Sequence, residues 1–486
     1  MRLLPLLPAA LLLAGFAVEQ DQLDRGRQVY METVSPSGDE IVATLGEGTE
    51  IPGSAVPCSG CHGRDGIGRP EGGVAPTDIT WKNLTRPYGL VRATGERVPP
   101  YDEASLAKAI AEAVDPAGIS FHVAMPRYRM SRQDMDDLVA FLKALGQVPD
   151  PGVGESEVRI ALLPPPPGPL TGLGEAVRAA VAARFAEVNA EGGVFGRRIE
   201  LVTMEADAFA AVAPFFAGAD AERFAREEMP AIGPFTLHPH ESLAVNRQVF
   251  YLFPGIAEQA RALALHAKAG PRPVLLAPED ESLAPAIEAA EHALHPAVIR
   301  YRRDRFDPAA LAHDLAAREA DPLLFLGSGP EAVALLRAAE PFPDWRPRLL
   351  VTALAADGSL FESPKAFDGR ILLALPAPIG GATPEADARY RALALAHRLP
   401  TEHHSAQLAG LAATEVLLEG LMRCGRDLSR DGFIEKLEGL RQLDTGYAPP
   451  LTFGPSRRLG AHGAWLVRLD LAAQRLEPEG GWVEAE

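Results

Sequence analysis

The sequence predicts a multidomain protein in which a small all-α domain precedes a larger α/β part with two lobes. Up to residue 147, apolar residues recur with helical spacing between loops rich in Gly and Pro. From residue 157 onward, short apolar strands alternate with helices, which is typical of parallel sheets covered on both faces. The length of 486 residues agrees with this organisation, since about 150 residues make one domain.

The composition is that of a folded protein with an acidic surface. Charged residues make up 23% of the chain and hydrophobic residues 47%, which excludes a disordered chain. The net charge of -18 argues against binding to nucleic acids or to anionic lipids, because both need clustered Lys and Arg side chains. We therefore expect neither class of partner.

The first residues have the pattern of a secretory leader. Arg2 is followed by an apolar run over residues 3–18 and by small residues near position 17. Pro5 and Pro8 interrupt this run, which is shorter than the roughly 20 residues that cross a membrane. We expect residues 1–17 to be a cleaved signal peptide and the mature chain to be periplasmic, without a membrane span.

Helical spacing dominates residues 21–147. Helices are predicted over residues 103–114 and 131–145, and Ser131 has the position of a helix cap. Residues 148–156 continue a run of turn formers without apolar period, and we interpret them as an interdomain linker.

The α/β part extends over residues 157–478. About 320 residues of alternating strands and helices exceed one hydrophobic core, which predicts two lobes. The clearest predicted strands cover residues 158–163, 199–204, 231–233, 249–253, 274–277, 323–326, 349–352 and 371–375, and the first long helix covers residues 172–190.

One motif carries identifiable chemistry. Cys58-x-x-Cys61-His62 is the c-type haem attachment pattern, in which two thiols on one helical turn form thioethers and the histidine lies under the iron. A redox dithiol would follow a strand of a βαβ unit, and a zinc site needs further ligands, whereas the remaining thiol, Cys424, lies in another domain. We expect one covalent haem c with His62 as proximal ligand.

The second axial ligand has several candidates downstream of this motif. Met125 precedes Pro126 on the loop before the last helix of the domain, where a side chain can be directed at the iron, and we assign it. Met130 and His122 remain alternatives, while Met135 belongs to the apolar stripe of the helix.

Residues 21–147 resemble a class I cytochrome c domain. The resemblance rests on residues 58–63, on Asp65-Gly66-x-Gly68 and on residues 124–128 ahead of the final helix. It implies that Met125 is the distal ligand. Since both axial positions are then filled, we expect an electron carrier and not an enzyme such as a peroxidase.

Residues 157–478 are similar to periplasmic substrate-binding proteins of the leucine/isoleucine/valine type, which serve ABC transporters. The matching segments are residues 168–174, 188–199, 444–454 and 463–470. The resemblance implies a type 1 binding-protein fold, in which two α/β lobes close around a small ligand through a hinge.

The chain departs from this second family where the ligand is held. Relatives that bind amino acids use a longer stretch after the strand at residues 231–233, with a Ser/Thr pair for the carboxylate and ammonium groups. Here residues 234–248 are short, and Thr236 is the candidate that we nominate. We interpret His238 and His240 as surface histidines of a loop, and Cys424 as an unreactive buried thiol.

Together the two resemblances imply a periplasmic cytochrome that transfers single electrons, with a solute-binding module for docking or sensing. The expected partner is a periplasmic dehydrogenase, and chains that pair these domain types resemble accessory proteins of quinoprotein alcohol dehydrogenases. The alternative is a solute receptor of an ABC-type uptake or sensing system in which the haem domain is regulatory.

Overall fold

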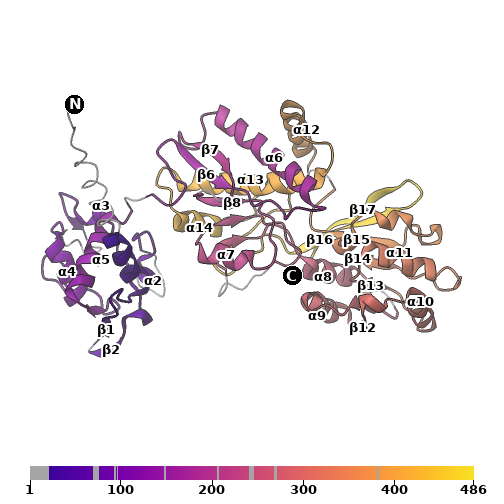
Figure 1. Cartoon of the computed structure of the whole chain (residues 1–486), viewed down its shortest axis with the longest axis horizontal. Coiled ribbons are helices and arrows are strands. Elements are labelled where there is room, and N and C mark those ends of the chain that lie inside the picture. Colours follow the sequence, from indigo (N-terminus) through magenta and orange to yellow (C-terminus); the bar gives the residue numbers. More distant parts are fainter. Residues whose placement is uncertain are drawn as a thin grey trace, which may run out of the picture. The chain divides into compact units, whose positions relative to one another are not determined.

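The structure is a computed structural model that describes residues 21–46, 48–68, 76–91, 95, 97–146, 149–204, 207–239, 246–267, 271–379 and 383–485. The chain divides into two compact units, residues 1–150 and 151–486 (Figure 1). The predicted leader, residues 1–17, lies outside the described residues, as do Gln147 and Val148 before the predicted linker. The domain boundaries drawn from the sequence stay predictions.

The first unit is helical, with short strands at its periphery. Its described helices are residues 21–32, α2 (Cys58–His62), α3 (Trp81–Leu84), α4 (Glu103–Glu112) and α5 (Arg132–Ala144). Among the described residues, β1 (Val42–Leu45), β2 (Thr49–Pro52) and β5 (Arg127–Arg129) form one antiparallel sheet, and β3 (Leu90–Val91) pairs with β4 (Arg97–Val98). Ser131 caps α5 through a hydrogen bond from Asp134 N, as predicted.

The helix at residues 21–32 crosses α5 at very close range. A Cβ atom on Gly26 would lie 2.0 Å from Asp137 O, so only a glycine permits this approach. Beside the crossing, the Tyr30 and Phe141 rings pack with centroids 5.4 Å apart, and the Arg25 guanidinium donates to the Asp137 carboxylate at 2.7 Å. The two ends of the first unit are thereby joined in one core.

The first lobe of the second unit is built on a parallel sheet in the order β10-β9-β8-β6-β7. Alternate residues of its strands face two apolar clusters, so Ile160 and Val212 lie in one and Ala161 and Ala211 in the other. The strands are β6 (Glu157–Ala161), β7 (Arg198–Val202), β8 (Ala210–Val212), β9 (Ala231–Ile232) and β10 (Val249–Phe250); the helices are α6 (Thr171–Ala190), α7 (Asp220–Arg226), α12 (Pro384–His397), α13 (His404–Cys424) and α14 (Arg430–Glu438).

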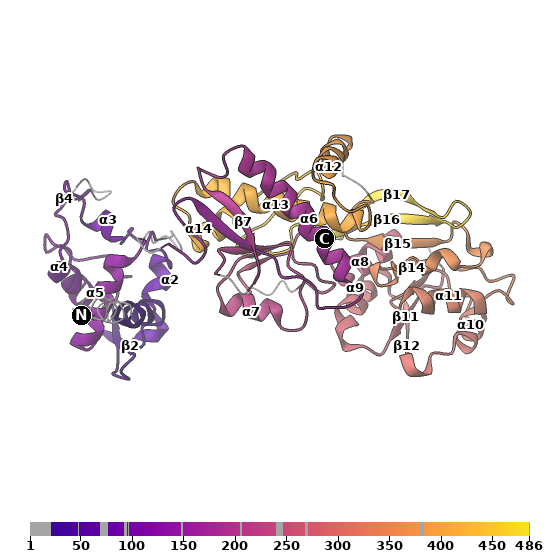
Figure 2. The ribbon, with the colours of Figure 1, turned by 45° about the horizontal axis from the view of Figure 1, so that its top comes forward.

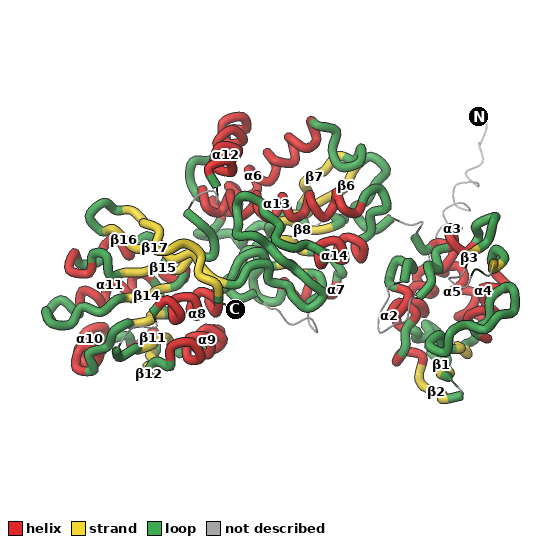
Figure 3. The backbone as a smooth tube through the Cα atoms, turned by 180° about the vertical axis from the view of Figure 1, so that it is seen from behind, coloured by secondary structure: helices red, strands yellow, loops and turns green. Residues whose placement is uncertain are grey.

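The second lobe has a larger mixed sheet in the order β12-β11-β13-β14-β15-β16-β17. Helices α8 and α9 cover one face, while α10 and α11 cover the other (Figures 2 and 3). Its elements are α8 (Ile256–His266), β11 (Val274–Pro278), α9 (Ala284–Leu294), β12 (Ala297–Tyr301), α10 (Pro308–Ala317), β13 (Leu323–Phe325), α11 (Gly329–Ala338), β14 (Leu349–Val351), β15 (Ile371–Leu375), β16 (Gly463–Asp470) and β17 (Arg475–Glu484). The antiparallel pair β16 and β17 closes one edge.

Crossing segments that join the two lobes run side by side. Tyr251 N donates to Arg458 O at 2.8 Å, and Gly460 N donates to Tyr251 O at 2.8 Å. The Arg458 side chain is fully buried here, where it donates to the Glu438 carboxylate at 2.6 Å and lies 4.6 Å from the Phe250 ring centroid. These contacts fix the hinge strands to the first lobe.

The fold class predicted from the sequence is confirmed: a helical cytochrome-like part followed by a two-lobed α/β fold. Within the described ranges, no helix is long and apolar enough to cross a membrane.

Candidate haem site

The attachment motif forms the short helix α2. Pro57 precedes it in an extended conformation, and Gly63 ends it with a φ of 74°. Cys58 and Cys61 are three residues apart on this helix, so both thiols project from one face. The sequence therefore folds locally into the arrangement that two thioether bonds to one porphyrin require.

The His62 ring is oriented by the backbone of a distant segment. Its Nδ1 lies 3.0 Å from Thr77 O, and since a carbonyl oxygen can only accept, Nδ1 carries the proton. The other nitrogen, Nε2, then has a free lone pair for a metal. Burial lowers the pKa of His62, which favours the neutral ring that iron ligation needs.

Residues 30–33, at the end of the helix at residues 21–32, contact α2 and Gly63 after it. Thr33 Oγ1 accepts from Cys58 N at 3.3 Å and lies 3.8 Å from Cys58 Sγ. Ser59 donates to Met31 O at 3.0 Å, and Tyr30 donates to Gly63 O at 2.6 Å. Burial raises the pKa of Cys58 to about 11, so this thiol is protonated until it is modified.

The candidates for the second axial ligand differ in their surroundings. Met125 and Met130 are partly buried and pack against the core of the first unit. His122 is exposed, and its Nδ1 accepts from Ala124 N at 3.3 Å within the turn that leads to Met125. Met135 also packs against the core, from helix α5. Within the turn at residues 122–125, Met125 is therefore the apolar side chain that packs against the core.

The residues present fit a haem c. Partly buried apolar side chains pack against the core of this unit, and side chains of this kind can contact a porphyrin; they include Cys58, Ile79, Trp81, Leu90, Phe121 and Met125. Two thiols, an imidazole with a free Nε2 and a thioether are the ligands that c-type haems use. Within the described part of the chain, no three His, Cys, Asp or Glu side chains gather as a separate metal site.

Some supporting residues were missed by sequence reasoning. Thr77 O orients His62 and Thr33 contacts Cys58, yet neither belongs to a spaced motif. The helix at residues 21–32 was missed as well. Its buried positions Val29 and Tyr30 give only a weak helical stripe that the glycine at position 26 interrupts.

The residues predicted for the second unit have ordinary local roles. Thr236 is partly buried, and its Oγ1 accepts from His238 N at 3.2 Å, which closes a short turn. His238 is exposed, and His240 lies outside the described residues. Cys424 packs against the first-lobe core, where burial raises the pKa of its thiol to about 12. Ligand binding at Thr236 stays a prediction.

Two family profiles match separate parts of the chain. The profile described as Cytochrome c matches residues 50–146, and the profile described as Periplasmic binding protein matches residues 203–475. A search of curated proteins finds no match.

Solved structures resemble the second unit. They include a fatty acid ABC transporter substrate-binding protein from Thermomonospora curvata, with 18% identity over 69% of this chain and 93% of that one, at a TM-score of 0.54. A putative branched-chain amino acid ABC transporter protein from Rhodospirillum rubrum has 14% identity over 66% of this chain and 100% of that one, at a TM-score of 0.55. A leucine-binding protein from Thermotoga maritima has 16% identity over 67% of this chain and 98% of that one, at a TM-score of 0.52. Identities this low establish the fold alone.

Proposed function

We propose that the chain is a periplasmic electron carrier. The chain belongs to the periplasmic binding protein family and carries a cytochrome c domain in front of that module. In this proposal the first unit transfers single electrons, and the second unit docks a partner or senses a small molecule. The periplasmic location is supported by the family of the second unit and by the leader-like residues 1–17.

The observation that carries the proposal is the hydrogen bond between His62 Nδ1 and Thr77 O. It fixes the ring tautomer and leaves Nε2 free, on the same short helix that presents Cys58 and Cys61. A cytochrome c domain implies a covalently bound haem c, which supplies one-electron exchange at its iron when bound.

The chain's own residues determine how that exchange would be tuned. We assign His62 as proximal ligand, and we assign the Met125 thioether as distal ligand, because a thioether raises the reduction potential relative to a second imidazole. If His62 and Met125 both held the iron, no position would remain on it for a peroxide or another substrate. The proposed role is therefore transfer and not catalysis.

The redox partner that we propose is a periplasmic dehydrogenase, with a quinoprotein alcohol dehydrogenase as the first one to test. The acidic balance of the chain, with a net charge of -18, favours a partner that presents Lys and Arg at its contact surface.

The experiment is a redox titration of the purified full-length holoprotein, followed by stopped-flow mixing with a reduced quinoprotein alcohol dehydrogenase. We expect one reversible one-electron transition and reduction of the haem at a rate that falls with added salt. The matched variants are Cys61→Ser, which should lose the reversible transition, and Cys424→Ser, which should keep it.

The solute-receptor alternative predicts a different result. In that case the haem would not be reduced by any dehydrogenase, while a solute would raise the melting temperature of the second unit. A ligand at 100 times its Kd stabilises by about 2.7 kcal/mol, which a thermal melt detects readily. A haem that never cycles would refute the electron-carrier proposal.

A further inference from the structure

Helix α12 lies at the surface of the first lobe and has apolar residues on two opposite faces. Figures 1 and 3 show this helix at the outer boundary of the second unit. One face packs on the first-lobe core through Ala386, Tyr390 and Leu393. A typical surface helix has a single apolar stripe that faces the core, so the second apolar face of α12 needs a separate explanation.

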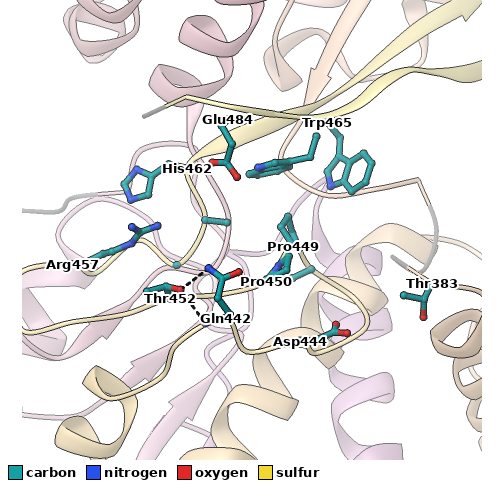
Figure 4. A pocket seen from close by; sticks show the side chains of 14 residues that line it. Thr383, Gln442, Asp444, Pro449, Pro450, Thr452, Arg457, His462, Trp465 and Glu484 are labelled. Carbon is teal, nitrogen blue, oxygen red and sulfur yellow. Dashed lines mark hydrogen bonds between the residues drawn. The ribbon is translucent and has the colours of Figure 1, made fainter.

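The fold fixes the position of α12 at its first turn. Thr383 Oγ1 caps the helix by accepting a hydrogen bond from Ala386 N at 3.2 Å. Figure 4 shows Thr383 and Asp444 on the same side of a pocket beside β16 and β17. The turn after Asp444 packs against the helix, since a Cβ atom on Gly446 would lie 2.9 Å from Ala386 Cβ. The direction in which the outer face of α12 points is therefore set by the lobe.

The outer face of α12 is both apolar and exposed. Its residues follow one another at spacings of four, three and one positions, which keeps them on one side of a helix. They are displaced by two positions from the buried set, which is roughly 200° around the helix axis. Leu395 is 84% exposed, more than any other large hydrophobic residue that the structure describes. The outer face consists of Ala388, Ala392, Leu395 and Ala396, all of them exposed.

The charges of α12 are separated along its axis. Glu385 and Asp387 lie in the first turn, whereas His397 and Arg398 lie at the end. Arg391, between them, is turned back along the helix, where its Nε donates to Asp387 O at 3.3 Å. When two such helices lie antiparallel, the acidic start of each faces the basic end of the other. A parallel pair would bring like charges together, so the face is complementary to itself in one orientation.

We propose that two copies of this chain associate through α12, with the two helices antiparallel and related by a two-fold axis near Ala392. Ala392 lies at the centre of the outer face, so Leu395 of each copy fits between Ala388 and Ala392 of the second copy. The helix dipole explains the charges of a single helix, but it does not explain a leucine left in water. A two-fold contact between identical surfaces is the commonest way in which identical chains associate.

The size of the contact sets the expected affinity. Helix α12 has 14 residues, which corresponds to a length of about 21 Å, and a helix is about 10 Å wide. Two such faces bury less than the roughly 1,200 Å² of a stable complex, so we expect a weak and reversible dimer with a Kd on the order of 10–100 μM. This association does not depend on the proposed electron transfer, because α12 belongs to the second unit.

The test is sedimentation-velocity ultracentrifugation of the full-length holoprotein, from about tenfold below to about tenfold above that Kd. We expect the average mass to rise toward that of two chains. Leu395→Glu should weaken association at least about tenfold, because it places a charge in an apolar contact. The matched control is Met422→Glu, which should change the Kd by less than about twofold: Met422 is 53% exposed, but it lies roughly 27 Å along α13 from His404, whose ring packs on Tyr390 of α12.

Cysteine cross-linking tests the orientation of the two helices. In a Cys424→Ser background, Ala392→Cys should form a disulfide-linked dimer under mild oxidation, because this residue lies beside its own copy at the two-fold axis. Met422→Cys in the same background should stay monomeric. A protein that is monomeric at every concentration would overturn the proposal. Unchanged association of Leu395→Glu, or equal cross-linking of the two cysteine variants, would overturn it as well.

Discussion

The crossing at Gly26 gives the sharpest test of how the first unit is held together. In Gly26→Ala the new Cβ atom would start 2.0 Å from Asp137 O, 2.7 Å from Asp137 C and 2.7 Å from Phe141 Cβ. Two of these atoms belong to the backbone of α5, so no side-chain rotation relieves the clash. The two helices must move apart.

The cost follows from this geometry. Separating the helices by more than 1 Å loosens the contacts of Tyr30 and Phe141, and overpacking of this kind costs about 3 kcal/mol at the upper end of its usual range. Since 1 kcal/mol shifts the melting temperature of a domain of this size by about 4 °C, we expect a decrease of roughly 12 °C.

The assay is a thermal melt followed at the haem absorption band, which reports on the first unit and not on the second. Gly60→Ala is the control, because its Cβ atom would meet only the Pro57 side chain at 3.6 Å. A change of at most about 2 °C is expected there, since alanine is favoured in a helix. If Gly26→Ala had the same melting temperature as the control, the close helix crossing would not be what stabilises this unit.

Three further predictions concern other parts of the molecule. Met125→Ala should abolish the far-red absorption of Met–iron ligation and lower the midpoint potential by on the order of 0.1 V, within the ~0.8 V that axial ligands span. Met130→Ala should keep both the absorption and the potential. The reverse result would assign Met130 as the distal ligand. Arg458→Met should lower the free energy of unfolding in urea by about 3 kcal/mol, because the largely buried Glu438 carboxylate loses its fully buried partner and keeps only the Arg247 contact at 3.8 Å. The half-exposed Arg468→Met should cost less than about 1 kcal/mol, and equal costs would show that the buried pair is not stabilising. Burial raises the pKa of Asp137, but hydrogen bonds from Arg25 and Gln133 outweigh burial and lower this pKa overall. The stability that this carboxylate contributes is therefore present above about pH 4 and is lost as the pH falls through the lowered pKa. Melts of Asp137→Asn should therefore lie a few degrees below wild type at neutral pH and converge with it in acid, and a constant difference would contradict this.

The sequence predicted many strands of the second unit because they carry a local signal, whereas β8, β12 and β17 were not predicted. Residues 371–375, for example, coincide with β15. In a parallel sheet buried on both faces, every strand residue is apolar, and this run is visible without any knowledge of partners.

The first unit was less predictable. Strand β1 contains Thr44 and, besides its hairpin with β2, pairs with β5 from a distant part of the chain, so its place in the sheet depends on tertiary contacts. The helix at residues 21–32 is stabilised mainly by its crossing with α5 through Gly26, a residue that disfavours helices in isolation.

For the candidate site, the sequence predicts residues for covalent attachment but not the residues that position them. A porphyrin attached at Cys58, Cys61 and His62 would require a fixed spacing of these residues, which a sequence displays directly. Thr77 contributes only a backbone oxygen, which any residue could supply, so no side-chain pattern reports it.

The most direct measurement of the central claim is mass spectrometry of the tryptic peptide that contains Cys58, Cys61 and His62, prepared from protein made in a host able to attach haem c. We expect this peptide to carry the added mass of one haem. Recovery of the peptide at its unmodified mass, with both thiols free to alkylation, would contradict it.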